Sequence, residues 1–183
     1  MKFQETVLKG NYVITLEKKN DSRGFLSRLY CNKILRLILK RKNILQINRT
    51  LTKKRGTVRG LHFQYHPYSE TKIVTCIKGK VWDVVVDLRK NSPTFLHYHA
   101  EILSDNNLKS FFIPEGFAHG FQTLTNNCEM LYFHTSFYNS KYEGAINATD
   151  PIISVKWPRK ITHRSKRDIG IPLSNKNFSG IKL

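Results

Sequence analysis

The chain has 183 residues, of which 40% are hydrophobic and 11% aromatic, a composition typical of a folded domain and not of a disordered segment. No apolar run approaches the roughly 18 residues that a membrane span needs, and the N-terminus lacks the apolar region of a signal peptide. The three cysteines are widely spaced, as expected for reduced thiols. We therefore expect one cytoplasmic domain over residues 1–183, with no membrane span.

The 31 Lys and Arg residues exceed the 13 Asp and Glu residues and give a formal net charge of +18. Such a charge suggests an anionic partner. The basic clusters at 40–42, 53–55 and 164–167 are short, however, and no nucleic-acid-binding motif accompanies them. We favour solvated basic surfaces and expect no nucleic-acid partner, although a nucleotide diphosphate would need only a local part of this charge.

Residues 33–42 form the best helix candidate, because apolar residues at 34, 35 and 38 lie between basic flanks. An amphipathic helix of this kind could lie on an anionic membrane. We favour the alternative, in which its apolar face packs on a sheet.

The rest of the chain has the pattern of strands separated by turns. Residues 58–64 alternate, so that Leu61 and Phe63 face one way while His62 and Gln64 face the other. Strands are also predicted at 73–77 and 81–88 around a turn at 78–80, and at 111–113, 120–124 and 129–137. Many short strands at regular spacing indicate an all-β barrel or jelly-roll fold, with a few short peripheral helices.

Residues 114–119 (PEGFAH) resemble the second motif of cupin barrels, in which the histidine often binds metal. The pair His97 and His99 has the spacing of the first motif but follows a turn, and no suitable glutamate comes after it. A metal ion needs three or four convergent ligands. We therefore expect the barrel without a metal.

His62 is a candidate general base. A histidine titrates near neutral pH and suits proton transfer when a carboxylate orients it, and Asp168 is a candidate for that carboxylate. Taken alone, His62 is more often a hydrogen-bonded structural residue, Lys72 a solvated charge and Tyr132 a core residue. Sequence reasoning from single residues leaves these alternatives open.

An ordered set of motifs, from about residue 10 to residue 173, resembles the dTDP-4-dehydrorhamnose 3,5-epimerases, which are metal-free cupins of dTDP-rhamnose and polysaccharide biosynthesis. No single motif is sufficient, but the ordered series is specific. The motifs lie at residues 23–25, 46–48, 58–64, 72–74, 81–95, 113–121, 131–132, 150–151, 157–158 and 165–168.

The resemblance implies epimerisation at C3 and C5 of a nucleotide-linked 4-keto-6-deoxyhexose, without a cofactor, in a homodimer whose N-terminal strands pair across the interface. It implies that His62, oriented by Asp168, is the base. Lys72 then stabilises the enolate, and Tyr132 delivers a proton to the opposite face of the sugar.

The resemblance also implies a set of substrate-binding residues. Arg23 and Arg59 are expected at the diphosphate, and Gln46 and Asn48 toward the nucleotide. Tyr138 lies where small pocket differences decide how many carbons are inverted. The full set is Arg23, Arg28, Gln46, Asn48, Arg59, His119 and Tyr138.

Two positions depart from the family pattern. Arg28 stands where the family usually has a glutamate near the thymine base, and a guanidinium donates hydrogen bonds where a carboxylate accepts them. Arg49 stands where a histidine is usual, so both changes are expected to add positive charge near the nucleotide. The alternatives are a C3-only or C5-only epimerase acting on a different nucleotide sugar, or a non-catalytic sugar-binding cupin.

Overall fold

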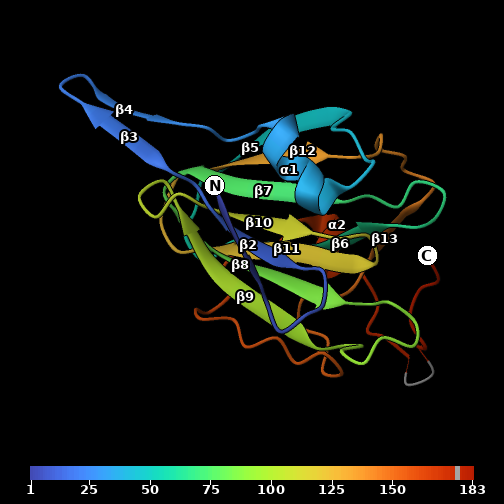
Figure 1. Ribbon diagram of the computed structural model, residues 1–183. Helices are drawn as coiled ribbons and strands as arrows, with labels where there is room; N and C mark the ends of the chain where they lie inside the picture. The colour runs from blue at the N-terminus through green and yellow to red at the C-terminus, as the bar shows by residue number, and fades with distance from the viewer. Residues whose placement is uncertain (176–177) are drawn as a thin grey trace.

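Two antiparallel sheets face each other in the computed structural model, which describes residues 1–175 and 178–183 (Figure 1). The six-stranded sheet has the order β1 (Lys2–Glu5), β2 (Tyr12–Thr15), β10 (Lys109–Ile113), β7 (Lys72–Lys78), β12 (Cys128–His134) and β5 (Gln46–Thr52). The five-stranded sheet has the order β13 (Glu143–Ala145), β6 (Val58–Gln64), β11 (Phe117–Thr123), β8 (Lys80–Asp87) and β9 (Tyr98–Ser104). This arrangement confirms the predicted all-β fold.

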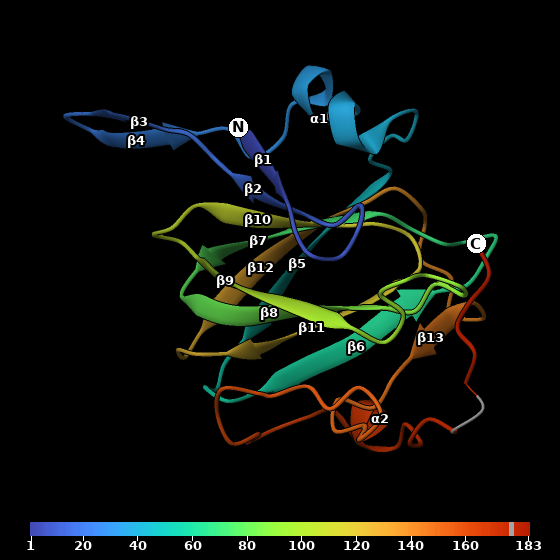
Figure 2. The ribbon, with the colours of Figure 1, turned by 60° about the horizontal axis from the view of Figure 1, so that its bottom comes forward.

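The main core lies between the two sheets. On β8, Val81 and Val85 face this core, while Val84 and Val86 pack on the other face against residues that follow β13, including Ile146 and Ile153. Because β8 is covered on both faces, it is an almost continuous apolar run and not a simple alternation. Figure 2 shows the C-terminal part of the chain beneath the five-stranded sheet, including α2 (Lys166–Ile169).

The helix α1 (Asn32–Leu39) covers the outer face of the six-stranded sheet (Figure 2). Its buried residues Leu35 and Leu39 pack with Ile14, Ile73 and Phe133. The expected packing on a sheet is therefore confirmed. The helix is shorter than predicted, because Lys40 has a φ of 58° and leaves the helical conformation.

A separate hairpin of β3 (Lys18–Asp21) and β4 (Gly24–Ser27) projects away from the two sheets (Figures 1 and 2). Its side chains are exposed along almost its entire length. Arg23 lies in the turn between these two strands, and Arg28 directly follows β4. Both were expected at the substrate.

A close approach of two glycines sets the position of His62. A Cβ on Gly60 would lie 2.6 Å from Cα of Gly120 and 2.7 Å from the His119 carbonyl oxygen, so only glycine fits where β6 passes β11. The register then places His62 directly opposite His119. Leu61 and Phe63 pack with Ile146 and Ile153 in the second hydrophobic cluster, whereas His62 and Gln64 line the cavity between the sheets. The two pairs therefore face opposite ways, as predicted.

Candidate active site

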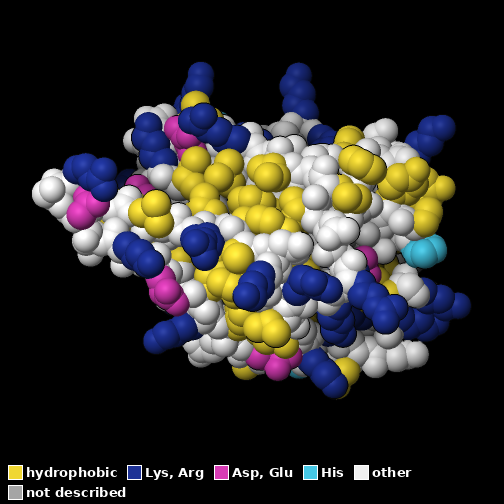
Figure 3. Space-filling view, turned by 45° about the horizontal axis from the view of Figure 1, so that its top comes forward, with side chains coloured by type: hydrophobic (Ala, Val, Ile, Leu, Met, Phe, Trp, Pro, Cys, Tyr) yellow, Lys and Arg dark blue, Asp and Glu magenta, His cyan; other side chains and the backbone are white. Residues whose placement is uncertain are grey.

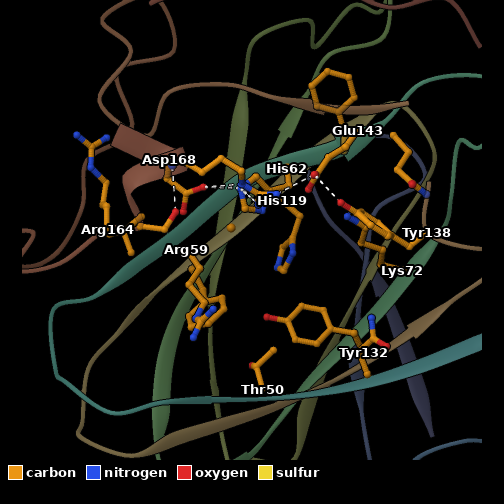
Figure 4. Close-up of a pocket in the computed structure, with 18 of the residues that line it drawn as sticks. Thr50, Arg59, His62, Lys72, His119, Tyr132, Tyr138, Glu143, Arg164 and Asp168 are labelled. Atoms are coloured by element: carbon orange, nitrogen blue, oxygen red, sulfur yellow. Dashed lines mark hydrogen bonds and ion pairs between the residues drawn. The ribbon is translucent and has the colours of Figure 1, made fainter. Parts of the chain in front are cut away.

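A cavity of about 650 Å³ lies between the sheets and contains all four residues expected to act in catalysis. The five-stranded sheet contributes Arg59, His62 and His119, and the six-stranded sheet contributes Asn48, Thr50, Lys72, Tyr132 and His134. Figure 4 shows Asp168 beside His62 on one side of the cavity, and Tyr132 with Thr50 on the other.

His62 and Asp168 form a hydrogen-bonded pair. Nε2 of His62 lies 2.8 Å from Oδ1 of Asp168, whose side chain is only 4% exposed. Asp168 comes from α2, where its backbone N–H donates to Oγ of the N-cap residue Ser165 at 3.0 Å. The short helix thus fixes the carboxylate beneath β6.

The ionised carboxylate determines the tautomer of His62. Burial favours the neutral acid, but the hydrogen bond and charge of His62, with Ser165 and Arg167, outweigh it and lower the pKa of Asp168. Nε2 therefore carries a proton and donates it to Asp168, and Nδ1 keeps the free lone pair of a base. Nη2 of Arg167 also lies 3.1 Å from Nε2, but a guanidinium cannot accept that proton.

Tyr132 is a partly buried phenol on the opposite sheet, and Figure 4 shows its hydroxyl directed into the cavity, near Thr50 and Arg59. Burial raises the pKa of Tyr132, and the negative charge of Asp83 raises it further. Thr50 and Arg59 act in the opposite direction, with smaller effect. Tyr132 therefore stays protonated at neutral pH and can donate a proton.

A second histidine–aspartate pair lies beside the same cavity, which His119 lines. Nε2 of His119 lies 2.8 Å from Oδ1 of Asp83, which is fully buried on the inner face of β8. Burial raises the pKa of Asp83, and His119 partly opposes this effect. The rings of His119 and Tyr132 meet edge to face, with centroids 6.0 Å apart.

Lys72 enters the cavity from β7 with its side chain 10% exposed. Its ammonium lies 3.0 Å from Oε1 of Glu70, whose other oxygen lies 2.6 Å from Nδ1 of His134. A buried ammonium needs such a partner, because an isolated charge in a dry site is costly.

Most of the expected binding residues lie at the cavity. Asn48, Arg59, His119 and Tyr138 line it. Gln46 is adjacent, because its Oε1 accepts from the backbone N–H of Tyr138 at 3.2 Å and its Nε2 donates to Asn48 at 3.2 Å.

Three arginines that were expected near the substrate do not line the cavity of their own chain. Arg23 and Arg28 lie outside the cavity of their own chain, and Arg23 is 88% exposed and paired with Asp21. Arg49 lies on the outer face of β5, where Nε donates to Glu129 at 2.8 Å. Arg49 does not line the cavity, whereas its neighbours Asn48 and Thr50 do, because alternate residues of a strand face opposite ways.

Several residues in or beside the cavity were not predicted from the sequence. Asp83 could have been found, because it is a carboxylate on the inner face of an apolar strand. Glu143 accepts from Tyr138 Oη at 3.0 Å and from Arg167 Nη1 at 2.8 Å, and nothing in its local sequence indicates this. Glu70 and Thr50 likewise lie in ordinary polar sequence.

In residues 1–175 and 178–183, no group of three or more His, Cys, Asp or Glu side chains is arranged to hold a metal ion. His99 lies on β9, at the edge of the five-stranded sheet, and packs against Phe111. Neither helix in the described part of the chain is long and apolar enough to cross a membrane.

Comparison with known proteins agrees with this architecture. The sequence model of the dTDP-4-dehydrorhamnose 3,5-epimerase family matches residues 5–176. The dTDP-4-dehydrorhamnose 3,5-epimerase of Salmonella typhimurium is 40% identical over 165 residues, which are 88% of this chain and 90% of that relative. The dTDP-4-dehydrorhamnose 3-epimerase of Streptomyces niveus is 32% identical over 169 residues, 92% and 81% of the two chains.

Among solved structures, the dTDP-4-dehydrorhamnose 3,5-epimerase from Elizabethkingia anophelis superimposes with a TM-score of 0.89 at 34% identity, covering 94% of this chain and 96% of its own. The match in sequence and the match in fold thus extend over nearly the whole chain. The protein is an isomerase and belongs to the dTDP-4-dehydrorhamnose 3,5-epimerase family.

Proposed function

We propose that this isomerase inverts C3 and C5 of dTDP-4-dehydro-6-deoxy-D-glucose and forms dTDP-4-dehydro-L-rhamnose. One observation carries the proposal: the base candidate His62 and the acid candidate Tyr132 lie on opposite walls of one cavity. Inversion requires a proton to leave one face of the sugar and return to the other, so two groups on facing walls are what the reaction needs.

His62 begins the reaction. The C4 ketone acidifies the hydrogens on C3 and C5, and Nδ1 of His62 takes one of them as a proton. The electron pair of the broken C–H bond moves toward C4 and leaves negative charge on the ketone oxygen. General-base catalysis of this kind contributes roughly 100- to 10,000-fold.

Lys72 stabilises the enolate formed in this step. Its ammonium is a fixed positive charge in a site largely shielded from water, where electrostatic stabilisation of a developing oxyanion is strongest. The surrounding hydrogen bonds are already in place, so little reorganisation accompanies the reaction.

Tyr132 completes the inversion. Its hydroxyl gives a proton to the carbon from the wall opposite His62, the enolate electron pair forms the new C–H bond, and the C4 ketone is restored. Solvent then returns a proton to the phenolate. The same sequence at the second carbon gives the doubly inverted product.

The nucleotide end of the substrate lies, in this proposal, near Gln46, Asn48 and Tyr138, with Arg59 at the diphosphate. Arg59 is already held in place, because its Nε donates to Thr52 Oγ1 at 2.9 Å. A guanidinium fixed in this way suits phosphate oxygens, which accept its paired N–H groups.

The proposed assembly is a homodimer that pairs N-terminal strands across its interface. An exposed apolar surface supports it: Figure 3 shows hydrophobic side chains gathered on the face that carries α1. A surface of this kind on a projecting hairpin and an edge strand is typical of an interaction site. The exposed hydrophobic residues of the hairpin, α1 and β5 are Phe25, Leu26, Leu37, Ile47 and Leu51. The free cysteines Cys31, Cys76 and Cys128 support a cytoplasmic location.

Deuterium exchange tests the function. The protein is incubated with dTDP-4-keto-6-deoxyglucose in deuterated water, and the deuterons at C3 and C5 are counted by mass spectrometry and NMR. Exchange at both carbons with inversion is the expected result. Exchange at one carbon would replace the proposal with a mono-epimerase, and no exchange with dTDP-, UDP- or GDP-linked substrates would overturn the enzymatic assignment.

A further inference from the structure

We propose that Glu70 is a positioning residue, which holds the Lys72 ammonium where the enolate oxygen forms, and that His134 in turn holds Glu70. This inference rests on the proposed function, because it concerns how Lys72 is prepared for its role. Neither Glu70 nor His134 is part of the motifs that identified the site.

The position of Glu70 between two partners is the first observation. Its side chain, 7% exposed, directs Oε1 to Lys72 at 3.0 Å and Oε2 to His134 at 2.6 Å. Lys72 and His134 are direct cross-strand partners on β7 and β12, so one carboxylate reaches both. Burial would raise the pKa of Glu70, but the charges and hydrogen bonds of Lys72 and His134 lower it, so the carboxylate is ionised.

The hydrogen bonds around His134 form a chain with one consistent direction. Nδ1 carries the proton donated to Glu70, which leaves the lone pair on Nε2, and Nδ2 of Asn48 lies 3.4 Å from that nitrogen. Oδ1 of Asn48 accepts from Gln46 at 3.2 Å. Residues expected at the nucleotide are thereby connected to Lys72 through His134 and Glu70.

The direction of this chain explains why a carboxylate is required. Glu70 must accept at both oxygens, because Lys72 and His134 are both donors. A glutamine has the same shape but presents an N–H on one side. The N–H of the glutamine would then face another donor, either the Lys72 ammonium or Nδ1–H of His134. Moving the His134 proton to Nε2 would relieve the second clash, but it would direct Nε2–H at the amide N–H of Asn48.

His134 also contacts the proposed acid. Its ring is stacked on that of Tyr132, with a centroid distance of 6.0 Å and an interplanar angle of 13°. The side chain that holds Glu70 thus packs beside Tyr132 on the same strand. Lys72 has a long flexible side chain, so the ion pair with Glu70, which His134 supports, is what fixes the position of its ammonium.

The decisive experiment is a double-mutant cycle between Glu70→Gln and Lys72→Ala, read out as the rate of deuterium incorporation at C3 and C5. We expect Glu70→Gln alone to lower kcat about 10- to 100-fold, because a displacement of a reacting group by about 1 Å costs on this order. KM and dTDP affinity by calorimetry should stay near the parent, whereas Tm should fall, because the buried Lys72 ammonium keeps only a weaker partner. In the Lys72→Ala background the same change should have no further effect.

Glu129→Gln is the matched control, because Glu129 is another largely buried carboxylate in an ion pair, but on the outer face of β12. It should keep the parental exchange rate. If Glu70→Gln does not fold, His134→Thr replaces it. This change leaves the Lys72–Glu70 pair in place and removes the second partner of Glu70, together with the stacking contact on Tyr132, and a loss of several-fold in kcat is expected.

Two results would overturn the inference: parental exchange in Glu70→Gln, or an equal loss from Glu70→Gln with and without Lys72. The second would show that Glu70 does not act through Lys72. Failure of the proposed function is distinguishable from both, because the parent protein itself would then incorporate no deuterium.

Discussion

His62 and His119 lie directly opposite each other on β6 and β11, and each is hydrogen-bonded at 2.8 Å to its own aspartate. The two pairs differ in exposure. His62 is 24% exposed and its partner Asp168 belongs to a surface helix, whereas His119 is 5% exposed and Asp83 is fully buried. His62 can therefore exchange its proton with solvent between turnovers, and this supports its assignment as the base.

Replacement of His62 by alanine should nearly abolish epimerisation. Without the imidazole, no group on that wall takes the proton, and a loss of roughly 100- to 10,000-fold in exchange is expected. The affinity for dTDP should be unchanged, because the nucleotide contacts lie elsewhere. NMR of samples quenched at fixed times in deuterated water measures the exchange rate, and calorimetry measures the dTDP affinity. Activity equal to the parent would show that the base is misassigned.

Replacement of Tyr132 by phenylalanine should separate exchange from inversion. His62 can still remove the proton and return a deuteron to the same face, so recovered substrate should carry deuterium while little inverted product forms. The ring is kept, and so is its edge contact with His119. If the variant loses exchange and inversion together, Tyr132 acts before reprotonation and the division of roles is wrong.

The projecting hairpin leads to a test of the homodimer. If Arg23 serves the cavity of the partner, mixing His62→Ala with Arg23→Ala subunits should restore activity. Half of randomly mixed dimers contain both variants, and each such dimer has one native site, so about a quarter of the parental activity is expected. Light scattering gives the oligomeric state in parallel. Mixtures as inactive as either variant would place Arg23 in its own subunit's function or in none.

Arg28 leads to a prediction about nucleotide selectivity. Because a guanidinium donates hydrogen bonds where a carboxylate accepts them, we expect weaker preference for thymidine diphosphate than in a relative with glutamate at this position. Calorimetry with thymidine, uridine and guanosine diphosphates measures this preference, and Arg28→Glu should strengthen it. A clear thymidine preference in the parent counts against the prediction.

The sequence was sufficient to predict the strands β6, β7, β8, β10, β11 and β12, but not β1–β5, β9 and β13, nor every direction in which side chains point. The alternation of β6, the regular spacing of many short strands and the ordered motifs led to the barrel and to His62, Lys72 and Tyr132. The outward orientation of Arg49 depends on strand register, which single-residue reasoning does not provide. Glu70 meets Lys72 because of how the loop before β7 turns.

The remoteness of Arg23 from the cavity has a different origin. Sequence resemblance assigns a residue to a site without saying which subunit's site it serves. The hairpin that carries Arg23 is exposed on its own chain, so the predicted contact of Arg23 with substrate requires the proposed homodimer and does not follow from the fold of one subunit.

Stability at acid pH should depend on Asp87. Its fully buried carboxylate accepts from the Arg89 side chain at 2.7 and 2.9 Å and from the hydroxyls of Ser92 and Thr94. Burial alone would raise the pKa of Asp87, but these hydrogen bonds outweigh it and lower the pKa. A folded-state pKa below the unfolded value of about 3.9 stabilises the protein above about pH 4, and this contribution is lost as the pH falls through the folded pKa.

Asp87→Asn should therefore destabilise the protein by about 2–4 kcal/mol at neutral pH, because it leaves Arg89 with a weaker partner. The difference from the parent should narrow as the pH falls below about 4. Urea unfolding between pH 3 and pH 7 measures it, with Asp21→Asn as the control, since Asp21 is half exposed in its pair with Arg23. If the difference in unfolding free energy stays constant over this pH range, the charge of Asp87 is not what stabilises the protein.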